Sequence, residues 1–481
     1  MNRRLAILLC LIQFTSPTIS QERQGMEQSN YLSTSGIFLN PSSSADSRCY
    51  MQFNLLDAQS LVSSNMAYIP SFSAWSLVKG NMPQNVVSKN PNGKDYTQVK
   101  AEATGPAFVI STMDFGAGIF VRLRSNSIAK GISYDALMQV LDPQSTYHYD
   151  YPQELKVKNA LIGSMTWAEY GLNYAKMYRL EPNRLLTIGL NLKYLNGIYL
   201  NYKFVDHLEA VLNDSTYDVL SIKAKDRYND PAFPSGKGFS GDFGITYKKM
   251  NSAINSYYVN SPRSNCNYID YKYKLSASLM DLGAIKFNRS TYRGDIDTTL
   301  YTSSQEIPIT DNLNVQYVTN KAIWAVCPSA LVLQGDYNFQ NNIYLSALLV
   351  KNLIPESVVG AQASNLLCIT PRFETRQVEV SLPFTLQRFQ YPYLGLAFRL
   401  RTFVFGVDNV LPFIVRTNTS HFGVYLKLGL SLFKNPACKT KALSVDDCKP
   451  GTKNKRWFGI PKMGDNMKKK RKSGKKFFNW F

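Results

Sequence analysis

The stretch HFGVYLKLGLSLF, residues 421–433, decides the fold class, because apolar side chains alternate with glycine or polar ones along it. The apolar set is Phe422, Val424, Leu426, Leu428, Leu430 and Leu432. Neighbouring residues of a β-strand point to opposite faces. The stretch therefore predicts a strand with one face in an apolar medium and the other in a polar space.

The same period of two recurs along the chain, most clearly in RLLTIGLNLKY (184–194) and FSGDFGITYK (239–248). Further strands are predicted at 48–56, 60–69, 101–113, 115–125, 163–177, 268–279, 281–290, 330–340, 342–351, 373–382, 393–402 and 404–409. A closed transmembrane barrel has an even number of antiparallel strands. We therefore expect an all-β fold, a transmembrane antiparallel β-barrel of about 14 strands (12–16).

Two kinds of connection join the predicted strands. MDFGAG (113–118), MDLGAI (280–285) and NFQNN (338–342) contain the Asp, Asn and Gly residues of tight turns, and each is predicted to close a hairpin. Long polar stretches at 80–98, 206–237 and 291–328 are predicted to be loops. Short turns on one rim and long loops on the other are typical of outer-membrane barrels.

A soluble sandwich or propeller would show the same alternation, but the composition favours a membrane barrel. Aromatic residues make up 13% of the chain. Many lie at predicted strand ends, where interfacial girdles belong: Tyr174, Tyr194, Tyr247, Tyr337 and Phe433. The opposite strand faces carry charged residues such as Arg122 and Glu169. These suit a wet lumen better than a soluble core.

The first residues predict export. Arg3 and Arg4 precede the apolar run LAILLCLI (5–12), and small residues follow at Thr18 and Ser20. This is typical of a secretory signal peptide cleaved after Ser20, and the apolar run is too short to span a bilayer as a helix. We expect a signal peptide at 1–20, an N-terminal entry segment or hatch at 21–47, an outer-membrane barrel at 48–433 and a periplasmic tail at 434–481. The expected location is the outer membrane of a Gram-negative bacterium.

The tail carries most of the basic charge. Residues 434–481 hold 15 Lys or Arg and 3 Asp or Glu, in a chain with a net charge of +20. The candidate contact residues are Lys468, Lys469, Lys470, Arg471, Lys472, Lys475, Lys476, Trp480 and Phe481. Outside the cytoplasm this cluster does not indicate nucleic-acid binding. We expect it to bind anionic lipid head groups or an acidic face of an envelope protein; the alternative is a solvated tail without a fixed partner.

Six cysteines remain after the expected cleavage, and an even number in an exported chain permits disulfides. Cys438 and Cys448 are close in sequence, so a bridge that closes a short loop is one interpretation. Zinc binding is the other, but no CxxC motif and no nearby His support it.

Catalytic chemistry has little support in this sequence. The chain holds only His148, His207 and His421, and none of them lies in HExxH. No Ser lies in GxSxG, and no phosphate-binding loop or dinucleotide fingerprint occurs. We therefore expect no enzyme activity, no cofactor and no metal site.

Four arginines on predicted inward positions form the candidate lumen site: Arg122, Arg124, Arg399 and Arg401. Rings of charge tune pores, so a basic stripe could select anions. The alternative is that these arginines pair across a plugged interior with Glu169, Asp242, Asp336 and Glu379.

Three segments carry a resemblance to a known family: SGIFLNPSSSADSRCYMQFNLL (35–56), KLSASLMDLGAIKFNRSTY (274–292) and LGLAFRLRTFVFGVDNVL (394–411). The sequence resembles Bacteroidetes-type outer-membrane barrels of a domain of unknown function, distantly similar to fatty-acid-transporter-like barrels and to barrels of the type IX secretion and gliding machinery. That family has no agreed activity to carry over. Six of its matching residues are interpreted as turn or entry architecture: Asn40, Pro41, Asp281, Gly283, Asp408 and Asn409.

Two functions remain open at this point. The first is an assembly or interaction component of the cell envelope, with outer-membrane lipid around it and envelope partners at its loops and tail. The alternative is a channel or transporter for small hydrophobic or anionic solutes, in which 21–47 folds back as a hatch and Asn40 and Pro41 belong to a gate.

Overall fold

The computed structural model describes residues 25–80, 86–88, 95–132, 153–213, 216–252, 260, 268–301 and 317–439. The expected signal peptide, His148, Cys266, Cys448 and the basic tail from residue 440 lie outside these residues. Among the described residues, no helix is both long enough and apolar enough to cross a bilayer.

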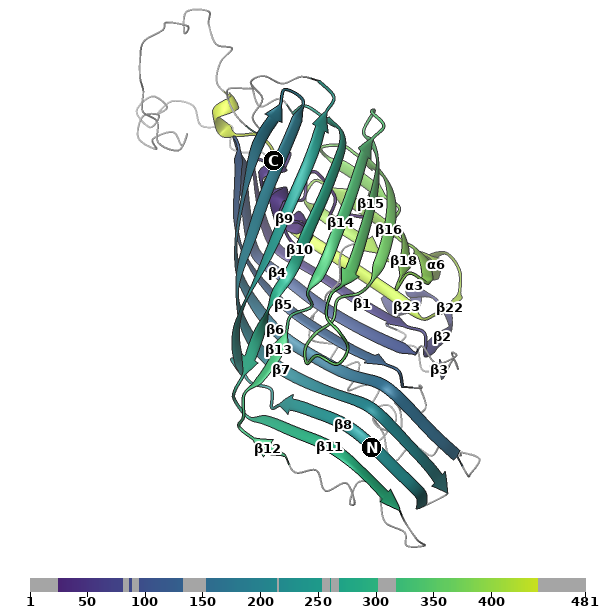
Figure 1. Cartoon of the computed structure of the whole chain (residues 1–481). Helices are drawn as coiled ribbons and strands as arrows, with labels where there is room; N and C mark the ends of the chain where they lie inside the picture. Colours follow the sequence, from purple (N-terminus) through teal and green to yellow (C-terminus); the bar gives the residue numbers. More distant parts are fainter. Residues whose placement is uncertain are drawn as a thin grey trace, which may run out of the picture.

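Strands make up nearly all of the regular structure (Figure 1). In the first half of the chain they are β1 (Met51–Ser64), β2 (Ala67–Phe72), β3 (Val87–Ser88), β4 (Tyr96–Thr112), β5 (Phe115–Lys130), β6 (Gln153–Glu181), β7 (Arg184–Asn213), β8 (Thr216–Asn229) and β9 (Gly236–Met250). In the second half they are β10 (Tyr271–Phe287), β11 (Thr291–Tyr301), β12 (Val318–Thr319), β13 (Ile323–Val326), β14 (Ala330–Asn338), β15 (Ile343–Asn352), β16 (Leu366–Glu374), β17 (Val378–Ser381), β18 (Phe384–Gln387), β19 (Tyr391–Leu394), β20 (Leu396–Leu400), β21 (Phe403–Val407), β22 (Thr417–Thr419) and β23 (His421–Leu432). The helical pieces are short: α2 (Ser33–Gly36), η1 (Pro41–Asp46), α3 (Ala74–Val78), α6 (Leu411–Ile414) and η3 (Pro436–Lys439).

The sheet closes on itself. β1 pairs antiparallel with β4 on one side and with β23 on the other, from Met51 opposite Leu432 to Ser63 opposite His421. Some strands of the barrel are split into two successive segments: β8 and β9 both pair with β7, and β17 and β18 both pair with β16. When such segments are counted as one strand, the described residues form a barrel of 14 strands. The predicted all-β, closed antiparallel barrel of about 14 strands is therefore confirmed.

The outer surface explains why the chain alternates. Two pairs of aromatic rings on the outer wall, Tyr194 with Phe239 and Tyr247 with Tyr273, lie 5.4 and 6.2 Å apart by ring centroid. Apolar side chains between the two levels, such as Phe243, are exposed. Phe239 and Tyr247 are about 26 Å apart along β9. After allowance for strand tilt, that spacing fits the apolar band of an outer-membrane barrel.

Two of the three predicted tight hairpins are confirmed. β4 ends at Thr112 and β5 begins at Phe115, and β14 and β15 are likewise joined by a short turn. The hairpin predicted at MDLGAI is wrong, because β10 runs through it without a break. Asp281 has φ 56° and lies in a bulge where the register against β9 shifts between Leu279 and Leu282. A bulge and a tight turn both require a residue in the left-handed conformation, so both favour Asp and Gly. The sequence alone therefore does not distinguish the two at this position.

The long polar stretches are not simply loops, and this corrects a second prediction. Residues 206–237 contain the end of β7 and all of β8, while 291–328 contain β11, β12 and β13. β6 and β7 have 29 and 30 residues, whereas about 9–11 residues span the membrane. In Figure 1 the ends of β6, β7, β8 and β11 extend past the rest of the barrel as a twisted sheet. We call this part the extension. The stretches 206–237 and 291–328 are polar because much of each forms sheet that lies outside the apolar band.

Candidate functional site

The N-terminal segment fills one half of the lumen. Residues 25–50, which we call the plug, lie within the ring of strands (purple in Figure 1), and Thr34, Ser35 and Ile37 are fully buried. The contacts of the plug come from strands all round the wall. Asn191 of β7 donates to the Ile37 carbonyl at 2.9 Å, and Lys427 of β23 donates to Thr34 at 2.6 Å.

Local chemistry shapes the plug. The Asn40 carboxamide accepts from the Ser42 amide at 2.9 Å and so caps the short helix η1, which begins at Pro41. Asn40 also donates to Thr246 of β9 at 3.2 Å. The wall is glycine where η1 presses on it: a Cβ at Gly189 or Gly244 would overlap plug atoms. Asn40 and Pro41 therefore lie in the plug, against the wall.

A cluster of buried ion pairs surrounds the middle of the lumen. Arg122 bonds Glu102 at 2.5 Å, and Arg124 bonds both Glu169 at 2.9 Å and Asp281 at 2.7 Å. Lys193 bonds Asp281 at 2.5 Å and Asp242 at 2.7 Å. These side chains are at most 13% exposed. Buried charges of this kind are stable only when paired, and here cations and carboxylates alternate.

A second set of ion pairs lies beside the plug. Arg372 bonds Asp336 at 2.5 Å and Glu374 at 3.0 Å, and Arg399 bonds Glu379 at 2.7 Å. The plug joins this set through Asn30, whose amide donates to Glu374 at 3.1 Å. Other plug pairs are Arg48 with Asp270 and Asp46 with Lys248. The lumen is thus polar and its charges are neutralised locally.

The candidate residues from the sequence divide into three groups. Arg122, Arg124 and Arg399 line the lumen, but Arg401 is exposed in the turn after β20, with φ 55°. Asp281 lies in the ion cluster. The remaining ones lie at close backbone approaches: Gly283, where a Cβ would overlap the Phe239 carbonyl; Asp408, whose amide donates to Gly423; and Asn409, which donates to the His421 carbonyl at 3.1 Å.

The cysteines and histidines complete this survey. Cys49, Cys327 and Cys368 are buried, while Cys438 is disulfide-bonded. Pairing of Cys438 with Cys448 stays a prediction. His421 is buried and stacks on Tyr393 at 3.8 Å between ring centroids.

A second closure, which the sequence reading missed, lies at the opposite half of the lumen. Residues 353–365, between β15 and β16, cross to the far wall; we call them the strap. Lys130 of β5 bonds both Glu356 and Gln362 at 2.7 Å, and Tyr202 of β7 donates to the Glu356 carbonyl at 2.7 Å. The only signal in KNLIPESVVGAQASNL (351–366) was the absence of period-two alternation.

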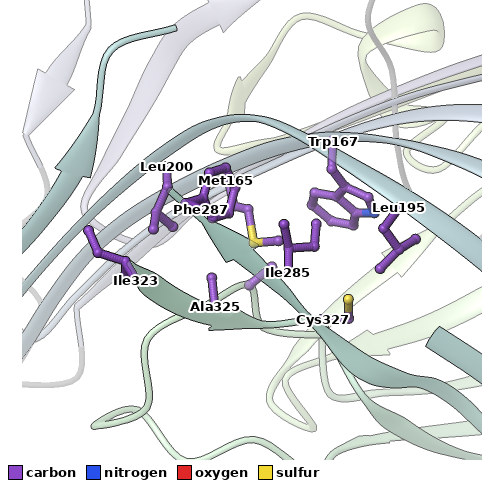
Figure 2. Close-up of a cluster of buried hydrophobic side chains, with 10 residues drawn as sticks. Met165, Trp167, Leu195, Leu200, Ile285, Phe287, Ile323, Ala325 and Cys327 are labelled. Atoms are coloured by element: carbon purple, nitrogen blue, oxygen red, sulfur yellow. The ribbon is translucent and has the colours of Figure 1, made fainter. Parts of the chain in front are cut away.

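Apolar packing seals the strap against the wall. Figure 2 shows Trp167, Ile285 and Phe287 pointing toward one another from β6 and β10. The cluster includes Ala361 of the strap, and Val359 packs against it. A cavity of about 50 Å³ lies between plug and strap, and Phe38, Arg122 and Ala363 help to line it. It can hold only a few water molecules.

The outer wall has an apolar pocket of about 450 Å³. Phe53, Pro106, Ile119 and Leu172 line it, and Phe120 lies among them although that side chain is only 2% exposed. Near this pocket the register of β1 against β23 shifts, and so does the register of β4 against β5. The inner side of Phe120 meets Phe38 of the plug edge to face, at 4.9 Å between ring centroids. Phe120 therefore lies between this pocket and Phe38 of the plug.

A closed strand ring with an apolar outer band and a polar, self-plugged lumen defines an outer-membrane-type β-barrel. Within that class, the chain belongs to the family of unknown function DUF5723, which matches residues 41–408. A search of curated proteins finds no match.

Solved structures give distant similarities. A mutant of the TodX monoaromatic hydrocarbon channel covers 87% of this chain and 98% of its own, at 10% identity and a TM-score of 0.43. The Ralstonia pickettii toluene transporter TbuX covers 87% and 98%, at 10% identity and a TM-score of 0.39. A Pseudomonas aeruginosa FadL homologue covers 87% and 99%, at 10% identity and a TM-score of 0.25.

Proposed function

We propose that this chain is a gated outer-membrane channel or transporter for small hydrophobic solutes, in which the plug is the gate. The observation that carries the proposal is the way the plug is held: hydrogen bonds and ion pairs from strands all round the ring join it to the wall. Polar contacts of this kind exchange readily with water. Such a plug can therefore shift without unfolding the barrel.

The lumen charges argue against selection of anions. Each inward arginine of the candidate stripe has a carboxylate within 3 Å, as in Arg122 with Glu102 and Arg399 with Glu379. A cation that is paired with a carboxylate attracts a passing anion only weakly. This narrows the alternatives from the sequence to hydrophobic solutes.

The pocket in the outer wall supports the hydrophobic class. Its lining is apolar, and Phe120 connects it to Phe38 of the plug. A solute of low polarity that occupies the pocket would press on Phe120, and the edge-to-face contact would pass the displacement to the plug.

A disulfide lock tests the gate. The hydroxyl oxygens of Ser42 in the plug and Thr246 in β9 are 2.7 Å apart. The double variant Ser42→Cys, Thr246→Cys therefore places two sulfur atoms within bonding reach. The matched control is Ser127→Cys, Ser164→Cys, whose native hydroxyls are 2.8 Å apart across β5 and β6 and do not touch the plug. Burial raises the pKa of the native Cys49 thiol to about 12, so this thiol stays protonated during mild oxidation.

The assay is uptake of a small hydrophobic fluorophore that an intact outer membrane excludes, in cells that produce the full chain. In cells with the plug-lock variant, oxidation should reduce uptake to the level of cells that lack the protein, and a reductant should restore the uptake. Oxidation should leave uptake by the control variant unchanged. Equal uptake by the oxidised plug-lock and control variants would refute the gate. Uptake that never exceeds that of cells without the chain would refute transport itself.

An assembly role in the cell envelope, the first expectation from the sequence, is the second candidate. The extension favours it, because β6, β7, β8 and β11 present a sheet surface beyond the apolar band. Crosslinking in intact cells should then recover an envelope protein attached to the extension. Recovery of lipid alone would count against this candidate.

A further inference from the structure

Two lysines stand side by side on the outer wall without a counter-charge. Lys237 of β9 and Lys286 of β10 are directly opposite each other in the antiparallel register. Both side chains are exposed, and neither ammonium lies within ion-pair distance of a carboxylate in the described part of the chain. Directly opposed like charges destabilise a strand pair. An anion bound between them would remove that cost.

Aromatic groups frame the pair. Trp324 of β13 is directly opposite Lys286, is 61% exposed, and has the Lys286 ammonium 5.7 Å from its ring centroid. One step toward the membrane, Phe239 lies opposite Ala284 and is 72% exposed. An amphipathic ligand would meet cations at one end and apolar surface at the other.

The position of the pair relative to the membrane decides the class of ligand. Tyr194 and Phe239 form the girdle at this level, and Leu282 and Phe243 continue the apolar band beyond them. Lys237 and Lys286 lie on the other side of the girdle, toward the extension. This is the level at which the phosphates of membrane lipids lie.

We propose that Lys237, Lys286 and Trp324 form a binding site for the head group of a phosphorylated membrane lipid. The two ammonium groups hold the phosphate, and the lipid chain lies against Phe239 and the small side chain of Ala284. The site lies outside the lumen, so it is independent of the transport function proposed above.

The test is lipid retention by the purified full chain in neutral detergent, measured by native mass spectrometry. The probes are phosphatidic acid, phosphatidylcholine with the same chains, and inorganic phosphate. Wild-type protein should retain phosphatidic acid at least tenfold more than phosphatidylcholine. The variant Lys237→Gln, Lys286→Gln should lose that preference.

The matched control is Lys223→Gln, Lys225→Gln, which removes the same charge from exposed positions on β8. It should retain phosphatidic acid as the wild type does. An equal loss of phosphatidic acid retention in both double variants would mean that overall charge alone causes the retention. Unchanged retention in both variants would mean that Lys237 and Lys286 do not bind the lipid. Each result overturns the proposal. Displacement of the lipid by an equal concentration of inorganic phosphate would also overturn it, since the site would then recognise free phosphate.

Trp324→Ala gives a readout that leaves both cations in place. It should reduce retention of long-chain phosphatidic acid and of a short-chain analogue alike, because the indole lies beside the head-group cation Lys286. An unchanged retention of both would contradict a role of the indole in the site.

Discussion

Asp281 offers a quantitative test of the ion cluster. Its carboxylate bonds Arg124 at 2.7 Å and Lys193 at 2.5 Å, and the side chain is only 9% exposed. Asp281→Asn keeps the shape but removes the charge. Two buried cations would then share the remaining carboxylates, Glu102, Glu169 and Asp242.

The expected size follows from this burial. Removing one partner of a buried ion pair costs about 3–5 kcal/mol, because the other charge stays desolvated. Since Arg124 keeps two carboxylates and Lys193 keeps one, we expect the lower end, about 3 kcal/mol in the free energy of unfolding. Asp297→Asn is the control: Asp297 pairs with Lys223, and these side chains are 73% and 50% exposed; loss of an exposed pair costs at most about 1 kcal/mol.

The assay is urea unfolding of the barrel in detergent micelles, followed by tryptophan fluorescence at several protein concentrations. A loss below about 1 kcal/mol for Asp281→Asn, or a loss equal to that of Asp297→Asn, would refute the reasoning. The double variant Asp281→Asn, Arg124→Met removes a charge of each sign, while Glu102 and Glu169 keep Arg122 as a partner. It should recover part of the loss, because fewer buried charges are then left unpaired.

Other perturbations act on the two closures and on the tail. Gly189→Ala adds a Cβ that overlaps the plug backbone, whereas Gly335→Ala meets only a side chain at 3.7 Å; conductance in planar bilayers should rise in the first variant only, and equal conductance would contradict the close approach. Lys130→Met removes both 2.7 Å bonds to the strap, so a water-soluble thiol reagent should modify the buried Cys327 several-fold faster; an unchanged rate would mean that apolar packing alone holds the strap. Deletion of residues 467–481 should weaken binding to anionic vesicles at least tenfold without changing the unfolding midpoint, and unchanged binding would indicate a solvated tail.

The wall of this barrel could be predicted from the sequence because its signal is local. In β23 the polarity of each side chain predicts whether it faces the lumen or the outside. Tyr194 and Tyr247 predict the positions of the two aromatic girdles from the sequence of their own strands. The lumen could be predicted only in part. Pairing of Arg399 with Glu379 was among the alternatives, since unpaired buried charge is costly.

Features that depend on distant parts of the chain escaped prediction. Asp281 reads locally as a turn, and only its neighbours across the ring, Arg124 and Lys193, show that it faces inward. The strap has no periodicity, so its contact with Lys130 becomes visible only in three dimensions. The alternation of β20 predicts that Arg401, two residues after Arg399, points into the lumen, but β20 ends one residue before Arg401.

The plug has a consequence for how the molecule is made. It precedes β1, yet its partners include Asn191, Thr246 and Lys427, which are spread over the ring up to the last strand. Contacts between residues so far apart in sequence form late in folding. The segment cannot complete its bonds until β23 takes its place beside β1. We therefore expect plug docking to be completed only after the last strand is in place.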